Sequence, residues 1–309
     1  MYLLRGMVVS FAVFFLVYVM LSAILVLVWQ TWGRKHSIPS AAFLLGIRVS
    51  PLIAALGLVA LFTLPSFLYL EPRFSSEAIS PGALAVAAAG AALLLAGIFN
   101  STRALVKTSR FIAGCMEHSL RLETASSICI YQVPSQDPLL VVAGVWRPKL
   151  LISSGTLALL DSDEIEAAIQ HEIAHVNRSD NLKKLVLHCC AFPWLGSLEY
   201  EWLKATEMAA DDAAADNKRT AISLASALIK MARPCVRMRT PELGMTLVPE
   251  NGAAVSARVE RLLSEISPAS KKQDRVMWWA LFASVGFVVC ANYGWALLQM
   301  HEMTEFLIR

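Results

Sequence analysis

The stretch Ala168-Ile169-Gln170-His171-Glu172-Ile173-Ala174-His175 contains the pattern H-E-x-x-H. Residues four apart on an α-helix lie one above the other, so both imidazoles can reach a single metal ion. Glu172 is placed to take a proton from a metal-bound water molecule. Because the chain has only six histidines, such a pattern seldom arises by chance. The stretch therefore predicts a helix that carries part of a zinc-hydrolase site.

The residues around this motif predict where the helix begins and which face it buries. Asp161 followed three positions later by Glu164 is the pattern of a capping box, so we expect a helix over residues 162–177. One arc of its helical wheel is apolar and is formed by Ile165, Ile169, Ile173 and Val176. Both histidines lie off this arc. We expect the helix to pack by the arc and still present the metal site.

The composition indicates a membrane protein. Of 309 residues, 56% are hydrophobic and 17% are charged, which is too apolar for an ordinary soluble protein. Four apolar runs, at 7–29, 49–70, 82–99 and 277–299, are each long enough to cross a hydrocarbon core of about 30 Å. Helices of one large soluble core are the alternative, but four such runs exceed what one core needs. The first run has no A-x-A cleavage pattern after it, so we interpret it as a retained span and not a signal peptide.

The third run is rich in alanine and contains Gly82, Gly90 and Gly97. Small residues let helices approach closely inside a membrane. We therefore expect this run to pack tightly against other helices.

Basic residues near the ends of the runs predict the orientation. The first loop has Arg34 and Lys35, and further basic residues flank the segment between the third and fourth runs: Arg103, Lys107, Arg110, Lys271, Lys272 and Arg275. We expect a multi-pass protein of the cell (inner) membrane, with both termini outside and the zinc motif in the cytoplasm. Arg5, on the outer N-terminus, departs from the rule.

These runs divide the chain into three predicted regions. Residues 1–102 form a three-helix transmembrane region, residues 103–272 form the cytoplasmic domain with the zinc motif, and residues 273–309 form a fourth transmembrane helix with a short external tail. The lipid bilayer is thus a predicted partner. The net charge of +3 gives no reason to expect direct binding of nucleic acid.

The six cysteines do not indicate a disulfide framework or a second metal site. Five of them fall in the predicted cytoplasmic part, where thiols stay reduced, and no C-x-x-C pair is present. Buried small hydrophobic side chains are the default interpretation for each of them.

The cytoplasmic segment predicts a few short strands followed by helices. Residues 103–124 have an amphipathic helical pattern, and strands are expected at 127–133, 139–142 and 149–153. The expected helices that follow cover residues 155–160, 162–177, 181–192, 196–217, 220–233 and 254–266. Prolines and glycines make 234–252 a predicted loop. This order indicates a mostly helical α+β fold with the zinc domain between the third and fourth spans.

A catalytic zinc site has three protein ligands and a water molecule, so the motif lacks one ligand. Asn181 stands six residues after His175, where metzincins have a histidine, so that class is excluded. Glu207 is a candidate ligand, with Asp211 one turn further along the same helical face. Asp211 would then hold the outer nitrogen of a ligand histidine. The spacing alone fits equally well with a solvated face of an alanine-rich helix.

The chain resembles the BlaR/MecR-type sensor-transducer zinc metallopeptidases of bacteria. The resemblance covers residues 100–266, and four segments carry it: Arg147–Ile152, His171–Asn181, Glu207–Asp211 and Ala257–Leu263. It implies a gluzincin-like endopeptidase (HExxH plus ExxxD) with His171, His175 and Glu207 as zinc ligands and Asp211 behind them. The chain departs from the antibiotic sensors because it ends at Arg309 without a penicillin-binding sensor domain or an S-x-x-K motif. A sensor partner is then a further expectation.

Our hypothesis is a membrane-embedded zinc endopeptidase. Glu172 takes a proton from water held by the three ligands, and the resulting nucleophile attacks a peptide carbonyl. The resemblance implies a cytoplasmic repressor or a similar signalling protein as substrate. Two alternatives remain: a protease for quality control of membrane proteins, and a non-proteolytic scaffold or receptor that keeps zinc for structure.

Several further residues have weaker claims to a role. Asp180 has the character of a helix cap, and His188 fits a helix interface better than an oxyanion-binding site. Tyr131 and Tyr200 can stabilise an oxyanion, although nothing in their spacing selects them. The strand near residues 142–144 is a candidate sheet edge for pairing with an extended substrate.

Overall fold

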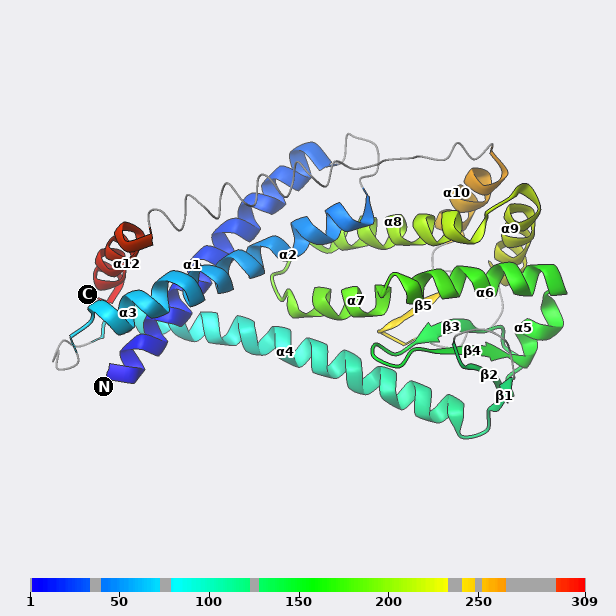
Figure 1. Ribbon diagram of the computed structural model, residues 1–309, viewed down its shortest axis with the longest axis horizontal. Coiled ribbons are helices and arrows are strands. Elements are labelled where there is room, and N and C mark those ends of the chain that lie inside the picture. The colour runs from blue at the N-terminus through cyan, green and yellow to red at the C-terminus, as the bar shows by residue number, and fades with distance from the viewer. Residues whose placement is uncertain are drawn as a thin grey trace. The chain divides into compact units, whose positions relative to one another are not determined.

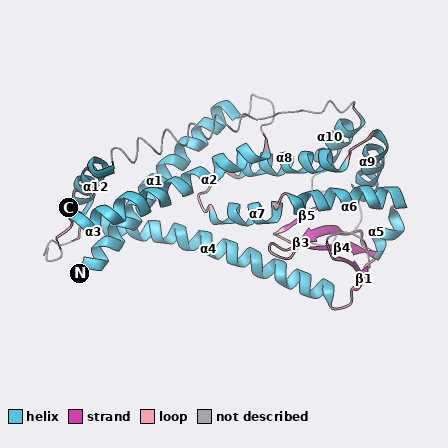
Figure 2. Ribbon diagram, viewed as in Figure 1, coloured by secondary structure: helices cyan, strands magenta, loops and turns pink. Residues whose placement is uncertain are grey.

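The structure is a computed structural model that describes residues 2–33, 40–72, 79–122, 128–232, 241–247, 252–264 and 293–308 (Figure 1). The chain forms two compact units. The first consists of Met1–Lys35, Val49–Ala96 and Pro268–Arg309, and the second of His36–Arg48 and Gly97–Ser267. Helices dominate and the strands form one small sheet, so the fold is the predicted mostly helical α+β class (Figure 2).

Long apolar helices cover the first three predicted spans. Helix α1 (Tyr2–Val28) ends in the π-helical turn η1 (Trp29–Gly33). Helix α2 (Ala41–Leu58), the π-helical turn η2 (Val59–Thr63) and α3 (Leu64–Leu70) follow one another without a break, and α4 covers Pro81–Met116. The segments Tyr2–Thr31, Ala41–Leu70 and Pro81–Met116 are long and apolar enough to cross a membrane. Of the predicted fourth span, residues 277–292 lie outside the described residues, and α12 begins at Tyr293 and ends at Ile308.

Helix α4 packs closely against α1 inside the first unit, as its small residues predicted. A Cβ atom at Gly90 would lie 2.2 Å from the carbonyl oxygen of Phe11, so only glycine permits this approach. Gly82, in contrast, has nothing within 4 Å of such an atom. The outward faces of these helices carry exposed large apolar side chains, as expected of surfaces that meet lipid: Leu16, Met20, Ile24, Leu61, Leu68, Leu84 and Leu95.

The second unit contains a five-stranded sheet in the order β1-β2-β4-β3-β5. Its strands are β1 (Leu120–Leu122), β2 (Ile130–Val133), β3 (Leu140–Ala143), β4 (Lys149–Ser153) and β5 (Gly244–Thr246). Strands β2 and β4 are parallel, and the other three pairings are antiparallel. The three predicted strands are therefore confirmed as β2, β3 and β4, whereas β1 and β5 were not predicted.

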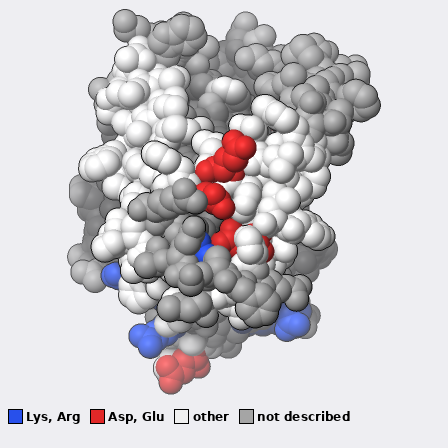
Figure 3. Space-filling view, turned by 90° about the vertical axis from the view of Figure 1, so that its left-hand side faces the viewer, with Lys and Arg blue, Asp and Glu red and all other residues white. Residues whose placement is uncertain are grey.

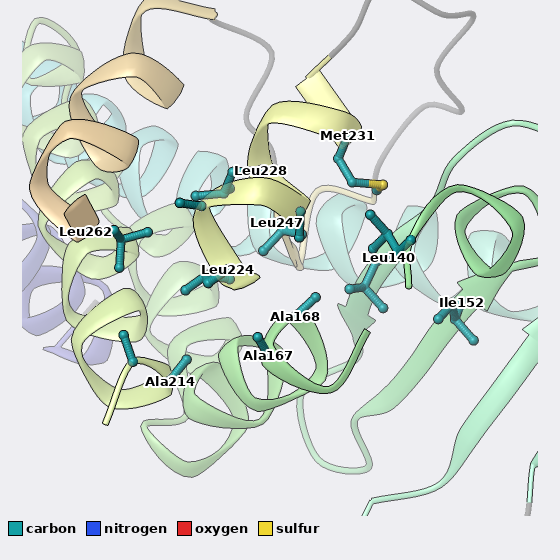
Figure 4. Packing of buried hydrophobic residues seen from close by; sticks show 14 of the residues in the cluster. Leu140, Ile152, Ala167, Ala168, Ala214, Leu224, Leu228, Met231, Leu247 and Leu262 are labelled. Atoms are coloured by element: carbon teal, nitrogen blue, oxygen red, sulfur yellow. The ribbon is translucent and has the colours of Figure 1, made fainter. Parts of the chain in front are cut away.

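Six helices follow the central strands, close to the predicted ranges. They are α5 (Ser154–Leu159), α6 (Ser162–Asn177), α7 (Asp180–Cys189), α8 (Gly196–Ala214), α9 (Lys218–Ala232) and α10 (Gly252–Leu263). A hydrophobic core joins the sheet to α5, α6, α8, α9 and α10 (Figure 4). Leu140 and Ile152 of the sheet, Ala168 of α6, Leu224 of α9 and Leu262 of α10 all contribute to it.

The expected apolar arc of α6 packs against this core but is only partly buried. The fully buried positions of α6 include alanines and the motif residues themselves. Their burial has a simple cause: α8 and α9 both pack on α6. Helix α6 therefore packs by its apolar arc, as expected, and the metal-site residues that it presents are covered by neighbouring helices.

Arg48, on α2, is built into the second unit and is only 2% exposed. Its Nε donates to Oε1 of Glu199 at 2.8 Å, near the start of α8. Its Nη2 donates to the carbonyl oxygens of Cys190 at 2.6 Å and Phe192 at 3.3 Å, in the connection between α7 and α8. One apolar helix therefore supplies the polar group that fixes the start of α8.

Candidate metal centre

Local sequence signals place the motif on a well-defined helix. The side chain of Asp161 accepts a hydrogen bond from the backbone N–H of Glu164, and the side chain of Glu164 accepts one from the backbone N–H of Asp161. The predicted capping box and the predicted helix over residues 162–177 are thus confirmed. His171, Glu172 and His175 follow on this helix and are at most 1% exposed.

Helix α8 brings Glu207 to the two histidines. Nε2 of His171 lies 3.1 Å from Nε2 of His175. Oxygens of Glu207 lie 3.5 Å from Nε2 of His171 and 3.6 Å from Nε2 of His175. The three side chains, all buried, form a group that can hold a metal ion.

The distances and the chemistry of these donors fit a zinc ion. Ligand atoms about 2.1 Å from a tetrahedral zinc ion lie roughly 3.4 Å from one another. The two Nε2 atoms are 3.1 Å apart, and each lies 3.5 or 3.6 Å from one of the two oxygens of Glu207. Nδ1 of each histidine faces a carboxylate, so in the neutral imidazoles Nε2 carries the lone pair. With both Nε2 atoms deprotonated, these lone pairs can bind one cation placed between the two rings.

Asp211 lies behind His171, and Arg258 holds Asp211. Oδ1 of Asp211 is 3.0 Å from Nδ1 of His171. Arg258 donates from Nε to Oδ2 of Asp211 at 2.7 Å and from Nη2 to Oδ1 at 2.6 Å, and its Nη1 lies 3.0 Å from Oε2 of Glu207. Burial raises the pKa of Asp211, but Arg258 outweighs burial and lowers it to about 2. Asp211 is therefore a permanent anion that orients His171.

Asp180 has the same relation to His175. Its Oδ2 lies 2.9 Å from Nδ1 of His175, and its Oδ1 accepts from Nζ of Lys183 at 2.9 Å. Asp180 is fully buried. The interpretation of Asp180 as a helix cap is wrong, because Ser179 occupies the N-cap position of α7 and Asp180 is the first helical residue.

The sheet holds the Glu172 carboxylate by a hydrogen bond to one of its two oxygens. Its Oε2 accepts a hydrogen bond from the backbone N–H of Val142 on β3, at 3.1 Å. Its Oε1 is buried and has no hydrogen-bond partner among the described residues. Burial, with a smaller contribution from Glu207, raises the pKa of Glu172 to about 8. A nearby cation would lower this pKa again, so Glu172 is suited to exchange protons near neutral pH.

Sequence reasoning missed Arg258, Asp180 and Asn181 as parts of this site. Asn181 donates from Nδ2 to the carbonyl oxygens of Val142 at 3.2 Å and Gly144 at 2.8 Å, which fixes the end of β3 beside Glu172. The only signal for Asp180 and Asn181 was their place in the stretch that resembles known metallopeptidases. The only signal for Arg258 was its place in the later stretch of that resemblance.

Other predicted residues lie in different surroundings. Tyr131 packs against a second core cluster, and Nζ of Lys149 lies 5.4 Å from the centre of its ring. His188 is half-buried near the end of α7, and burial lowers its pKa. Tyr200 is exposed on α8. The structure does not place these three side chains in the metal-binding group.

The sheet edge expected to receive substrate is already paired. Strand β5 runs antiparallel to β3, with Gly244 opposite Ala143 and Met245 opposite Val142. The expectation of an open edge at residues 142–144 is therefore wrong. The reason is that β5 lies in the stretch 234–252, whose prolines and glycines predicted a loop.

Comparison with known proteins agrees with this geometry. Residues 142–261 match Peptidase family M48, and the matched region runs from β3 to α10. The match supports a zinc metallopeptidase family, and M48 peptidases are typically zinc-dependent. No curated protein matches the chain.

Proposed function

We propose that this protein is an integral-membrane zinc endopeptidase that cleaves a cytoplasmic repressor or a similar signalling protein. His171, His175 and Glu207 are the proposed metal ligands, Glu172 is the proposed base, and Asp211 orients His171. The observation that carries the proposal is the convergence of three buried side chains: the Nε2 atoms of the two histidines are 3.1 Å apart, and Oε2 and Oε1 of Glu207 lie 3.5 and 3.6 Å from Nε2 of His171 and of His175. The match of residues 142–261 to a metallopeptidase family supports it.

The residues of the site divide the chemical work. Zinc, when bound, supplies a lowered pKa for coordinated water and polarises a substrate carbonyl. Glu172 accepts a proton at Oε1, the oxygen that has no hydrogen-bond partner among the described residues, and then delivers it to the leaving amine. Val142 holds the other oxygen of Glu172, so the carboxylate needs no reorganisation between the two transfers. Burial of all these groups strengthens their mutual electrostatic interactions.

The proposed topology is that of a multi-pass protein of the inner membrane, with the zinc domain in the cytoplasm. Its regions are residues 1–102, 103–272 and 273–309. Nη1 of Arg5 lies 2.9 Å from Oε1 of Glu71, and His301 of α12 faces the same carboxylate. These contacts support placing the N-terminus, the second loop and the chain end on one side of the membrane. The ion pair also explains how Arg5 is tolerated on the outer side, because Glu71 neutralises its charge.

A regulatory role is the finer part of the proposal, and the BlaR/MecR-type resemblance supports it. A sensor partner would then supply the signal. Quality control of membrane proteins and a zinc-stabilised scaffold remain the rival functions. The pairing of Glu172 with Val142 favours an enzyme over a scaffold, since a structural zinc site has no use for a fixed neighbouring base.

Substrate trapping with Glu172→Gln tests these functions together. The variant keeps the hydrogen bond to Val142 but cannot exchange protons, so we expect normal zinc content and at least about a hundredfold loss of turnover. Glu166→Gln is the matched control, because Glu166 lies on the same helix but is exposed. Trapped proteins are identified by crosslinking and mass spectrometry in the native membrane.

The trapped proteins decide between the three functions. Capture of a cytoplasmic DNA-binding regulator by Glu172→Gln supports the proposal. Capture of misfolded membrane proteins points to quality control. A zinc-loaded Glu172→Gln protein with normal proteolysis removes Glu172 from the mechanism, and zinc without any substrate supports the scaffold.

A further inference from the structure

The connection between α7 and α8, residues 190–195, presents an exposed tryptophan on a strained backbone. Trp194 is 77% exposed, and its φ of 69° lies in the left-handed region, which is costly for a bulky side chain. Between Lys184 and Glu199 the sequence contains no Asp, Glu, Lys or Arg. A large exposed apolar side chain on an uncharged stretch indicates a surface that meets an apolar environment.

Two of the long apolar helices hold the beginning of this connection. At Gly97 of α4, a Cβ would lie 2.4 Å from the carbonyl oxygen of Cys189, the last residue of α7. Oγ of Ser101, one turn further along α4, lies 3.0 Å from Sγ of Cys189. From α2, Nη2 of Arg48 donates to the carbonyl oxygen of Cys190 at 2.6 Å. The connection is therefore fixed at one level along both helices.

That level is the end of two apolar runs. Arg48 directly precedes the run 49–70, and Gly97 lies close to the end of the run 82–99. Both runs belong to helices that are long and apolar enough to cross a membrane. Because one run starts where the next run in the chain finishes, these two ends lie at the same surface of a bilayer. The connection therefore lies where the hydrocarbon core ends.

Exposed apolar side chains lie at the same level on α4. Ile98, next to Gly97, is 61% exposed, and Leu95 is 64% exposed. Figure 3 faces the left-hand side of Figure 1, and it shows few charged side chains among the described residues of that face. Uncharged surfaces on helices of spanning length are the surfaces that meet lipid. Trp194 thus lies at the level where such a surface ends.

We propose that the α7–α8 connection dips into the lipid bilayer, with the Trp194 ring at the boundary between the head groups and the acyl chains. Tryptophan is enriched at this boundary because its ring is apolar and its N–H can donate a hydrogen bond. The occupant is a glycerophospholipid bilayer and not a protein, because a protein interface has a polar rim and this stretch is uncharged. The inference rests on α2 and α4 spanning the membrane, and it does not depend on the proposed peptidase activity.

Membrane contact at this connection limits how far the metal-binding group lies from the bilayer. Helix α8 begins at Gly196, directly after the connection, and reaches Glu207 eleven positions later. Eleven residues of an α-helix extend over about 16 Å. The group of His171, His175 and Glu207 is therefore held within about 16 Å of the lipid surface.

Trp146 is a matched control for Trp194. It lies in the turn between β3 and β4 and is 74% exposed, so the two tryptophans differ little in exposure. A Cβ at Gly144, two residues earlier, would lie 3.5 Å from Cδ1 of Ile112 on α4. Ile112 follows Gly97 by fifteen positions, which is about 22 Å along the helix. Trp146 therefore lies outside the reach of the acyl chains.

Quenching of tryptophan fluorescence by lipids with brominated acyl chains tests the proposal. The full-length protein is reconstituted in vesicles of phosphatidylcholine and phosphatidylglycerol, and subtracting the signal of Trp194→Phe or Trp146→Phe from that of the wild type isolates each contribution. We expect the brominated lipids to quench the Trp194 contribution by about half or more, and the Trp146 contribution by less than about a tenth. Size-exclusion profiles and zinc content show that both variants are folded.

Photocrosslinking identifies the neighbour of each position without a difference measurement. The photoreactive amino acid p-benzoylphenylalanine is placed at position 194 or at position 146 of the full-length protein in native membranes. Lipid adducts at position 194 and none at position 146 support the proposal. Protein adducts at position 194 without lipid overturn it in favour of a protein partner. Equal quenching of the Trp194 and Trp146 contributions also overturns it.

Discussion

Arg258 of α10 donates hydrogen bonds of 2.7 and 2.6 Å to the two carboxylate oxygens of Asp211 on α8. The pair is almost fully buried. A bidentate guanidinium contact fixes the plane of the carboxylate, and one oxygen of that carboxylate lies 3.0 Å from Nδ1 of His171. Asp211 and Arg258, which stand 40 and 87 positions after His171 in the sequence, therefore control how that histidine is oriented.

We expect Asp211→Asn and Arg258→Met each to weaken zinc binding by roughly 10- to 100-fold, since both remove support from a ligand histidine. Arg258→Lys should not restore binding, because an ammonium group cannot make the bidentate contact. Competition with a fluorescent zinc chelator measures the affinity. Arg261→Met is the matched control on the same helix, since Arg261 pairs with Asp212 at the exposed face. Full zinc affinity in Arg258→Met would contradict this role.

Strand β5 covers the edge of β3 beside Glu172, so displacing β5 should increase proteolysis by giving an extended peptide access to that edge. A Cβ at Gly244 would lie 2.5 Å from Cγ of Pro241 and 3.1 Å from Cγ2 of Val141, so Gly244→Val should displace β5. We expect faster hydrogen exchange in residues 141–144 and faster cleavage of fluorogenic peptides. Gly114→Ala is the control, because nothing lies within 4 Å of the added atom. Displaced β5 with unchanged cleavage, at full zinc content, would place the substrate elsewhere.

The start of α6 should lose stability in acid. Burial raises the pKa of Glu164, but hydrogen bonds from Lys230, Ser226 and the backbone of Asp161 outweigh it, and the pKa lies below its ordinary value of 4.5. A lowered pKa in the folded state means that this stabilisation is present above about pH 4.5 and is lost as the pH falls through the folded-state pKa.

Replacing Lys230 tests this dependence. Lys230→Met removes the hydrogen bond that contributes most to lowering the pKa of Glu164. The melting temperature of this variant should therefore change less between about pH 3 and 5 than that of the wild type. Lys204→Met, which removes a partly exposed surface pair with Glu201, should keep the wild-type profile. Parallel pH profiles for Lys230→Met and the wild type would rule out the assigned cause.

Removing Arg48 should destabilise the second unit. Arg48→Met removes the buried donor that lies 2.6 Å from the carbonyl oxygen of Cys190, at a cost of roughly 2–3 kcal/mol. Glu199→Gln should cost only about 1 kcal/mol, because that carboxylate is partly exposed. Thermal unfolding in detergent measures both variants, and equal losses would mean that the carbonyl contacts contribute little.

The sequence predicted elements whose signals are local. The capping pair Asp161 and Glu164 marks the start of α6 within four residues, and apolar runs of spanning length mark the first three long helices. Glu207 was a weaker case, since its spacing to Asp211 fits an exposed face equally well. Only the packing of α8 on α6 brings Glu207 within 3.6 Å of both imidazoles.

The remaining features depend on contacts between distant segments. Arg258 reaches Asp211 across 47 positions, and no short pattern encodes that distance. Strand β5 is three residues long and follows Pro241, so pairing with β3 creates the strand where local preference indicates a loop. Aspartate at position 180 is a residue type that often caps helices, so the sequence indicated a cap. In the structure the bend after α6 turns the Asp180 side chain towards His175.

The position of Arg48 limits how the peptidase domain can be produced by itself. A soluble fragment that begins at residue 97 would lack the guanidinium that covers Cys190 and Phe192, although it would contain the entire H-E-x-x-H motif. Such a truncated protein would lose the donor to the carbonyl group of Cys190, in the connection that leads into the helix carrying Glu207. Supplying residues 41–48 as a separate peptide, or fusing them in front of the fragment, is the direct way to fill that gap.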